Sequence, residues 1–381
     1  MPIRAQAPGD DLGAHYDDGR SWLGEAEWFD AHTHMGADDP DGVKGTPSEI
    51  LAGLDDAGHR RALLFAMHEP TGYPAANDAV LEACAASDGR LVALVRVDPN
   101  ARGAVAEARR GLRAGARGIK LHPRSDAFGL PHPVVDELVA LAAERRALVL
   151  FHAGRGIPVL GLATAALARA HPPAAIVLAH AGISDLGLLR EEAAALPNLF
   201  FDTAWWQVAD VLALMTSIPP ARILYASDMP YGPGRFTALL LLRTARAAGH
   251  APEVVRAMAG GQLARLIDGQ APLELGPALG TARLSRRVPA LERVVVHASA
   301  AAHVSFRGGD PTEALALARL ACQTAGGEPH AALLAAADDA LSRAQQHVAL
   351  APGDGLAAVP GALVAQALCG TPEVEAPAAA A

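Results

Sequence analysis

The sequence predicts a closed (β/α)8 barrel, the TIM-barrel architecture, over residues 27–268, followed by a small C-terminal α+β extension. Two observations carry this prediction. Eight short runs rich in Val, Ile, Leu and Phe alternate with longer segments in which Ala, Leu, Arg and Glu recur at helical spacing. Eight such units in about 250 residues is the expected size of a closed barrel with parallel strands.

Each apolar run is a candidate strand. In chain order the runs are EWFDAHTH (27–34), RALLFAMH (61–68), LVALVRVD (91–98), RGIKLHP (117–123), ALVLFHAG (147–154), AIVLAHAG (175–182), LFFDTAW (199–205) and RILYASD (222–228).

The segments between the strands have the length of surface helices, for example residues 47–58, 100–115 and 132–146. Pro47 suits the first turn of its helix, and Pro197 and Pro219 end helices ahead of strands seven and eight. The alternative is an open doubly wound sheet, which usually carries a Gly-rich phosphate loop after its first strand. Here the first strand ends in His-Thr-His and no such loop follows it, so the barrel is favoured.

Composition narrows the classes of function. The formal net charge of −9 and the lack of a long basic run argue against nucleic acid as a partner. The first twenty residues lack the apolar core of a secretory signal, and no apolar run has the length of a membrane span. Three widely spaced cysteines indicate reduced thiols. We therefore expect a cytoplasmic protein that acts on a small molecule, away from membranes, with homodimer formation left open.

Five histidine or aspartate residues stand at the ends of predicted strands: His32 and His34 on strand one, His152 on strand five, His180 on strand six and Asp228 on strand eight. A lone His-x-His pair is ordinarily two unrelated histidines. In barrels, however, the chemistry lies at the C-terminal ends of the strands, where these five would meet. Strands one, five and eight would then provide three imidazole nitrogens and one carboxylate, which suit Zn²⁺, Mn²⁺ or Fe²⁺.

Six stretches in chain order carry a resemblance: DAHTH (30–34), GIKLHP (118–123), FHAG (151–154), LAHAG (178–182), LFFDTAW (199–205) and ILYASDMP (223–230). They resemble the amidohydrolase superfamily, and more narrowly the amidohydrolase-related branch that includes aminocarboxymuconate-semialdehyde decarboxylase. The resemblance implies a metal-dependent TIM barrel in which His32, His34, His152 and Asp228 bind one divalent ion, with Zn²⁺ the preferred assignment. His180 is the implied catalytic partner, and Asp228 would also accept a proton.

Lys120 on strand four raises an alternative. Other branches of the superfamily use a carbamylated lysine on this strand to bridge two metals, and His180 would then be a ligand of the second ion. We interpret Lys120 instead as an ion-paired lysine in a lower layer of the barrel, because only His122 lies right at the mouth of the strand. The choice between one metal and two stays open.

Candidate substrate contacts are Arg96 near the end of strand three, His122 after strand four and Trp205 after strand seven. Arg96 could grip a substrate carboxylate, or it could form a structural pair with a neighbouring acid. Of Trp205 and Trp206, alternation along a strand predicts that only one faces the pocket. These residues indicate a small, anionic substrate, and a tryptophan that faces the pocket would suit a cyclic one.

The rest of the chain lies outside the resemblance. Residues 1–26 form an N-terminal segment, and residues 269–288 are rich in Gly and Pro, as expected of a linker. In the extension, residues 289–371, we predict short strands at ERVVVHA (292–298) and AHVSFRG (302–308), then helices beginning near 311 and 329. Residues 372–381 are predicted to be disordered. The extension could be a small domain, a dimerisation element or a lid.

The leading hypothesis is a metal-dependent hydrolase in which an activated water attacks a carbonyl-type bond of an amide, lactone or ester. A non-oxidative decarboxylase or hydratase could use the same metal site, and the fold cannot separate these activities. The second alternative is a non-catalytic binding module with the C-terminal extension as its working region.

Overall fold

The computed structural model describes residues 11–40, 42–154, 157, 159–286, 288–323, 330–350 and 355–376. Its centre is an eight-stranded parallel sheet whose strands neighbour one another in sequence order. The strands are β1 (Phe29–Met35), β2 (Arg61–Ala66), β3 (Leu91–Arg96), β4 (Gly118–Leu121), β5 (Leu148–Phe151), β6 (Ala175–Leu178), β7 (Leu199–Asp202) and β8 (Ile223–Leu224). All eight predicted strands are confirmed.

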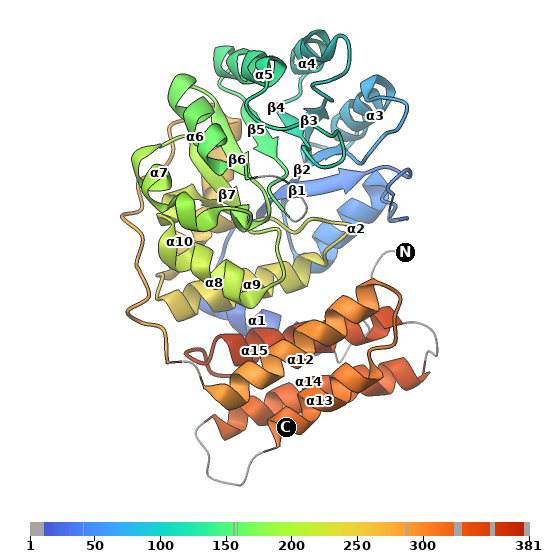
Figure 1. Cartoon of the computed structure of the whole chain (residues 1–381), viewed down its shortest axis with the longest axis vertical. Coiled ribbons are helices and arrows are strands. Elements are labelled where there is room, and N and C mark those ends of the chain that lie inside the picture. Colours follow the sequence, from blue (N-terminus) through green and yellow to red (C-terminus); the bar gives the residue numbers. More distant parts are fainter. Residues whose placement is uncertain are drawn as a thin grey trace.

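Hydrogen bonds between β1 and the chain that follows β8 close the sheet. The Ala31 amide donates to the Tyr225 carbonyl over 2.9 Å, and the His34 amide donates to the Met229 carbonyl over 2.8 Å. Helices cover the outside of the resulting barrel (Figure 1). They are α2 (Pro47–Ala57), α3 (Pro74–Ala85), α4 (Ala104–Arg113), α5 (Pro133–Glu144), α6 (Gly161–Ala170), α7 (Arg190–Ala195), α8 (Val208–Ser217), α9 (Gly234–Ala248) and α10 (Pro252–Arg256), preceded by α1 (Asp11–Leu23). The last helix of the barrel, α11 (Gln262–Ile267), packs instead against the core inside the barrel.

Alternation along the strands separates two apolar cores. On β2, Leu63 and Phe65 point into the barrel, whereas Ala62 and Leu64 pack against the surrounding helices. Helix ends follow the local sequence, as at α2, where Pro47 occupies the first turn and Thr46 forms a capping box with Glu49. The alternating apolar residues and the helix-capping residues of the sequence thus have the roles in the TIM barrel that the sequence predicted.

The C-terminal extension is entirely helical among its described residues, so the prediction of an α+β extension is wrong. The two predicted strands belong to one helix, α12 (Pro289–Phe306). It packs against α13 (Thr312–Cys322) and α15 (Val359–Gly370), and both of these contact α14 (Ala331–Leu350); we call the four helices the C-terminal bundle. Figure 1 shows the bundle in orange and red beside α1, α8 and α9, which contact α15.

The linker prediction fits the described part of residues 269–288, since residues 270–286 contain no helix or strand. The disordered tail is only partly supported, because Val374 is buried and its carbonyl accepts a hydrogen bond from Arg243 of α9. Residues 377–381, residues 1–10 and the expected helix start at 329 lie outside the described part of the chain. Among the described residues, no helix combines the length and hydropathy that a membrane span requires.

Candidate active site

Three ligand-type atoms meet at the C-terminal mouth of the barrel. His32 Nε2 lies 3.0 Å from His34 Nε2 and 3.3 Å from Asp228 Oδ1, and His34 Nε2 lies 3.0 Å from the same oxygen. All three residues come from the ends of β1 and β8, as predicted. Atoms that share one ion at about 2.0–2.2 Å are separated by about 3.0–3.5 Å, so this spacing matches a common ligand shell.

The backbone around these residues is irregular. The register of β1 against β2 shifts between Asp30 and Thr33, and the Asp30 carboxylate accepts hydrogen bonds from the amides of His32 and Ser227. Asp228 has φ +67°, a left-handed conformation that costs energy for a residue with a side chain. Its amide donates to the His32 carbonyl over 3.0 Å, which ties the end of β8 to β1. This local strain aims the Asp228 carboxylate at the histidines.

Asp202, at the end of β7, fixes the tautomer of His32. Its Oδ2 lies 2.7 Å from His32 Nδ1, and because a carboxylate only accepts, Nδ1 carries the proton and Nε2 presents a lone pair. The other Asp202 oxygen accepts the amides of His180 and Ala204 at 2.8 and 3.0 Å. Sequence reasoning did not single out Asp202, although an acid at the end of the seventh predicted strand was an available signal.

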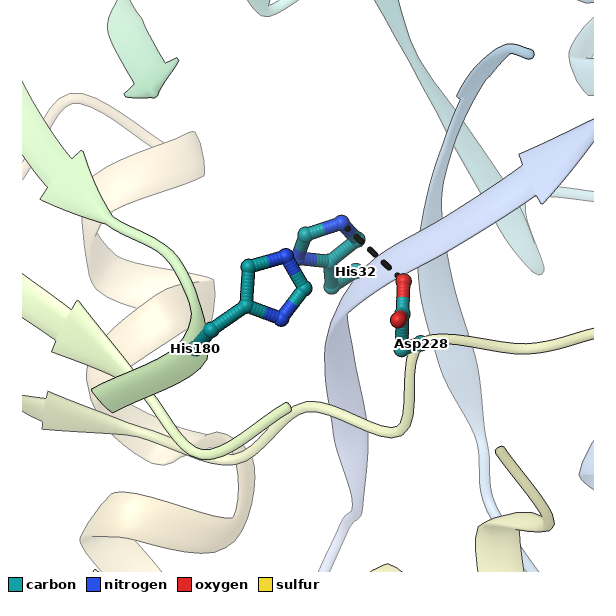
Figure 2. A group of neighbouring side chains, drawn as sticks. All are labelled: His32, His180 and Asp228. Atoms are coloured by element: carbon teal, nitrogen blue, oxygen red, sulfur yellow. Dashed lines mark ion pairs between the residues drawn. The ribbon is translucent and has the colours of Figure 1, made fainter. Parts of the chain in front are cut away.

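His180 joins this group from the turn after β6. Its ligand nitrogen lies within 4.8 Å of the ligand nitrogen of His32 and the ligand oxygen of Asp228, and Figure 2 shows the three side chains converging from three different elements. His180 Nδ1 lies 2.7 Å from the Ala204 carbonyl, so Nδ1 is the donor and Nε2 is unprotonated. The residue adopts φ +58°, a second strained position at the same site.

His152, the expected ligand from β5, contacts His180 directly. Its Nδ1 lies 3.0 Å from His180 Nε2 and must be the donor, because that nitrogen is unprotonated. His152 Nε2 is buried and has no hydrogen-bond partner among the described residues. The five predicted residues therefore form one contiguous cluster, in which His152 is linked to the first three through His180.

Burial sets the charge of the cluster. Desolvation holds the pKa values of His32, His34 and His152 well below the ordinary value of a histidine, and it also lowers the pKa of His180. The imidazoles are consequently neutral at pH 7, the state that binds metals. Desolvation likewise raises the pKa of Asp228 well above that of an ordinary carboxyl group.

The donor set fits a divalent cation. His32 Nε2 lies 3.3 Å from Asp228 Oδ1, a spacing at which both atoms can bind one ion. His34 Nδ1 and His152 Nε2 are buried and unpartnered among the described residues. Nitrogen and carboxylate ligands in this number suit Zn²⁺, Mn²⁺ or Fe²⁺.

Comparison with known proteins identifies the family. The model of a family described as amidohydrolase matches residues 29–266, well over half of the chain.

The chain belongs to this amidohydrolase family.

The match confirms the resemblance carried by the strand-end motifs, and members of the family typically bind a divalent metal. No curated protein matches this amidohydrolase. Two solved structures share its fold: an uncharacterised TIM-barrel protein from Bordetella bronchiseptica (15% identity, TM-score 0.52, covering 64% of this chain and 99% of the other) and the IDCase of Metarhizium anisopliae (14%, 0.50, 64% and 97%). At these identities the likeness concerns the fold alone.

We predicted that Lys120 forms an ion pair in a lower layer of the barrel, but its surroundings in the structure are different. It is fully buried, and its Nζ lies 3.3 Å from His32 Nε2 and 4.6 Å from the centre of the Phe65 ring. Desolvation lowers its pKa to about 7. No carboxylate of the described residues pairs with it within salt-bridge distance, so Lys120 belongs to the candidate metal site itself.

Arg96 and His122, two expected substrate contacts, are not among the described residues that line the cavity above the site. Arg96 is 2% exposed and pairs with Asp126 at 3.3 Å, while its guanidinium stacks over Tyr73. This is the structural pair that the sequence left open, and the role of Arg96 as a substrate contact stays a prediction. His122 stacks on His152 with ring centres 3.9 Å apart and does not line the cavity described next.

A cavity of about 820 Å³ opens above His152, His180 and Asp228. Trp205 and Trp206 both line it, so the expectation that one tryptophan turns away is wrong. Strand β7 ends at Asp202, and the irregular chain that follows does not alternate. Such a cavity, with polar groups converging at its base, is typical of a small-molecule site.

Proposed function

We propose that this amidohydrolase is a metal-dependent hydrolase that adds water to a carbonyl-type bond of a small substrate. One divalent ion, preferably Zn²⁺, would be held by His32, His34, His152 and Asp228. The convergence of three electron-rich atoms at 3.0–3.3 Å, beneath a cavity of substrate size, is the observation that carries the proposal.

A bound ion of this kind would lower the pKa of a coordinated water towards about 7 and polarise a carbonyl group. The protein side chains then handle the protons. Asp228, whose carboxylate lies 3.0 Å from His34 Nε2 and lines the cavity, is placed to take the proton of the attacking water. His180 is held by the Ala204 carbonyl with Nε2 unprotonated, so it can orient the water or pass a proton to the leaving group.

Hydrolysis is tested with a panel of lactones, esters and amides and two variants. In the metal-loaded protein, His180→Asn is expected to lower kcat by about 10²–10⁴-fold, the usual contribution of a general acid or base. His171→Asn changes a partly buried histidine outside the cluster and is the control. Turnover that survives in the His180 variant at the wild-type rate would contradict the assigned role.

Decarboxylation or hydration on the same site is the second candidate. It is favoured by the charge of the cavity, whose lining has two arginines and one acid, Asp228, among the described residues. Such a lining suits an acidic substrate. Assays with hydroxylated aromatic acids beside lactones separate the activities, because CO₂ release indicates the decarboxylase and ring opening indicates the hydrolase.

A further inference from the structure

The C-terminal bundle forms part of the active-site cavity, although it lies outside the matched family region. Among the twenty described residues that line the cavity, six come from α12 and α15, and a seventh, Arg307, directly follows α12. They include His303, Phe306 and Arg307 at the end of α12, and Leu363 and Gln366 on α15. The barrel supplies the floor with the candidate metal site, so the bundle supplies one wall.

Specific contacts hold this wall against the barrel. The Phe306 ring stacks on Trp206, with ring centres 4.4 Å apart and an interplanar angle of 25°. Gln366, which is 1% exposed, donates through Nε2 to the Trp206 carbonyl over 2.9 Å. Ser299 of α12 donates to Gln366 and contacts Gln207 at 3.3 Å. The loop after β7 and the bundle are therefore joined at the cavity.

The same junction is closely packed farther from the cavity. A Cβ atom on Gly370 would lie 2.5 Å from Val208 Cγ1, so the end of α15 sits directly against α8. Arg243 of α9 is buried and donates to Thr371 Oγ1 over 2.9 Å and to the Val374 carbonyl over 2.8 Å. The wall is thus a fixed part of the molecule.

Two exposed arginines give the cavity its charge. Arg124 follows β4 on the barrel, and Arg307 is the C-terminal cap residue of α12. No acid within the described ranges forms an ion pair with either of them. Two guanidinium groups above a site whose lining has one carboxylate among the described residues favour an anion, although the whole chain has a formal net charge of −9.

We propose that the C-terminal bundle is the specificity element of this enzyme, in which Arg307 acts with Arg124 to bind the anionic group of the substrate and Phe306 packs against its apolar body. This inference rests on the proposed function, because it assumes that the reacting group reaches His180 and Asp228. It assigns part of the selection of the substrate to Phe306 and Arg307, which lie outside the family barrel.

Isothermal titration of the metal-loaded protein with benzoate, benzamide and acetate tests the proposal. Benzoate and benzamide have nearly the same shape and differ in charge, whereas acetate keeps the charge and lacks the apolar body. We expect benzoate to bind most tightly.

Arg307→Ala and Arg124→Ala should each weaken the affinity for benzoate by about three- to tenfold, the range for partly exposed ion pairs and charge-assisted hydrogen bonds. The affinity for benzamide should stay unchanged. Phe306→Ala should reduce the preference for benzoate over acetate, and Phe306→Leu should restore part of it.

Arg293→Ala is the matched control, since Arg293 is exposed on the same helix and does not line the cavity. Repeating the titrations after metal removal separates binding by the wall from direct coordination. Equal binding of benzoate and benzamide, or equal losses in the Arg293 and Arg307 variants, would overturn the proposal. Metal uptake is measured separately, because a protein that takes up no Zn²⁺ on equilibration and still prefers benzoate contradicts the proposed function and not the role of the bundle.

Discussion

At the scale of single residues, the candidate site depends on residues that set the tautomer and orientation of its histidines. Asp202 touches no part of the cavity, yet it decides which nitrogen of His32 carries the proton and also holds the backbone of His180. Carboxylates that orient metal-binding histidines are a common second layer around metal sites. Metal affinity is therefore expected to depend on Asp202 almost as strongly as on the ligands.

Replacing Asp202 with Asn tests this dependence. The amide can donate to His32 Nδ1, which would move the histidine proton to Nε2 and turn it towards the metal position. We expect metal affinity to fall by about 10- to 100-fold, measured by competition with a chromophoric chelator. Asp136→Asn, an exposed position on α5, is the control. Unchanged affinity in the Asp202 variant would show that this carboxylate has no part in ordering the site.

Arg96 allows a second prediction at this scale. Arg96→Met leaves Asp126 buried beside Tyr73 without its cation, which typically costs about 3–5 kcal/mol of unfolding free energy. Urea denaturation measures the loss, and the double variant Arg96→Met with Asp126→Leu should recover much of it. A stable single variant with a raised KM would instead return Arg96 to the role of a substrate contact.

The strand-end histidines and Asp228 were predictable because parallel strands of a barrel end at one mouth. The position of Lys120 was not, since the sequence alone does not show how deep in the barrel a side chain ends or which groups of other strands face it. Arg96 illustrates the same limit: the sequence suggested a pair with a neighbouring acid, but its partner Asp126 lies beyond the next strand.

At the scale of elements, α12 shows how burial overrides intrinsic preference. Three consecutive valines, residues 294–296, favour a strand by composition. The buried positions of this segment nevertheless recur at helical spacing, at Leu291, Val294, Ala298, Ala301 and Ser305. The helical spacing of apolar residues was present in the sequence, but the run of three β-branched valines pointed to a strand and obscured it.

Attachment of the bundle to the barrel can be tested at Arg243 of α9. Arg243→Met removes its hydrogen bonds to Thr371 and Val374, and we expect a loss of about 2–4 kcal/mol and faster proteolysis near the C-terminus. The neighbouring Arg246 pairs with Asp18 at a partly exposed position, so Arg246→Met should cost less than about 1 kcal/mol. Equal stability of the two variants would contradict the importance of this attachment.

At the scale of the whole molecule, two buried histidines outside the site make stability depend on pH. Burial lowers the pKa of His15 to about 4 and that of His59 to about 3. In the unfolded chain these histidines have the ordinary pKa of about 6.5. At any pH between that value and their folded pKa values, the unfolded chain therefore binds more protons than the folded protein. Stability is therefore fully present above pH 6.5 and falls as the pH drops, by about 2 kcal/mol per histidine between pH 8 and pH 5.

His59→Phe isolates one of these contributions, because a phenyl ring can keep the stacking on Trp28 and cannot take a proton. The difference in unfolding free energy between pH 8 and pH 5, measured with urea, should be about 2 kcal/mol smaller in the variant than in the wild type. An identical pH dependence would mean that His59 is not held neutral in the folded protein.

The account as a whole depends on one divalent ion bound where β1, β5 and β8 end. Metal content by mass spectrometry, on wild-type protein and on His34→Ala after equilibration with Zn²⁺, tests this most directly. We predict one equivalent per chain in the wild type and a loss in the variant, with the helical circular dichroism unchanged. Wild-type protein that retains no metal, or a His34→Ala protein that retains a full equivalent, would contradict the central claim.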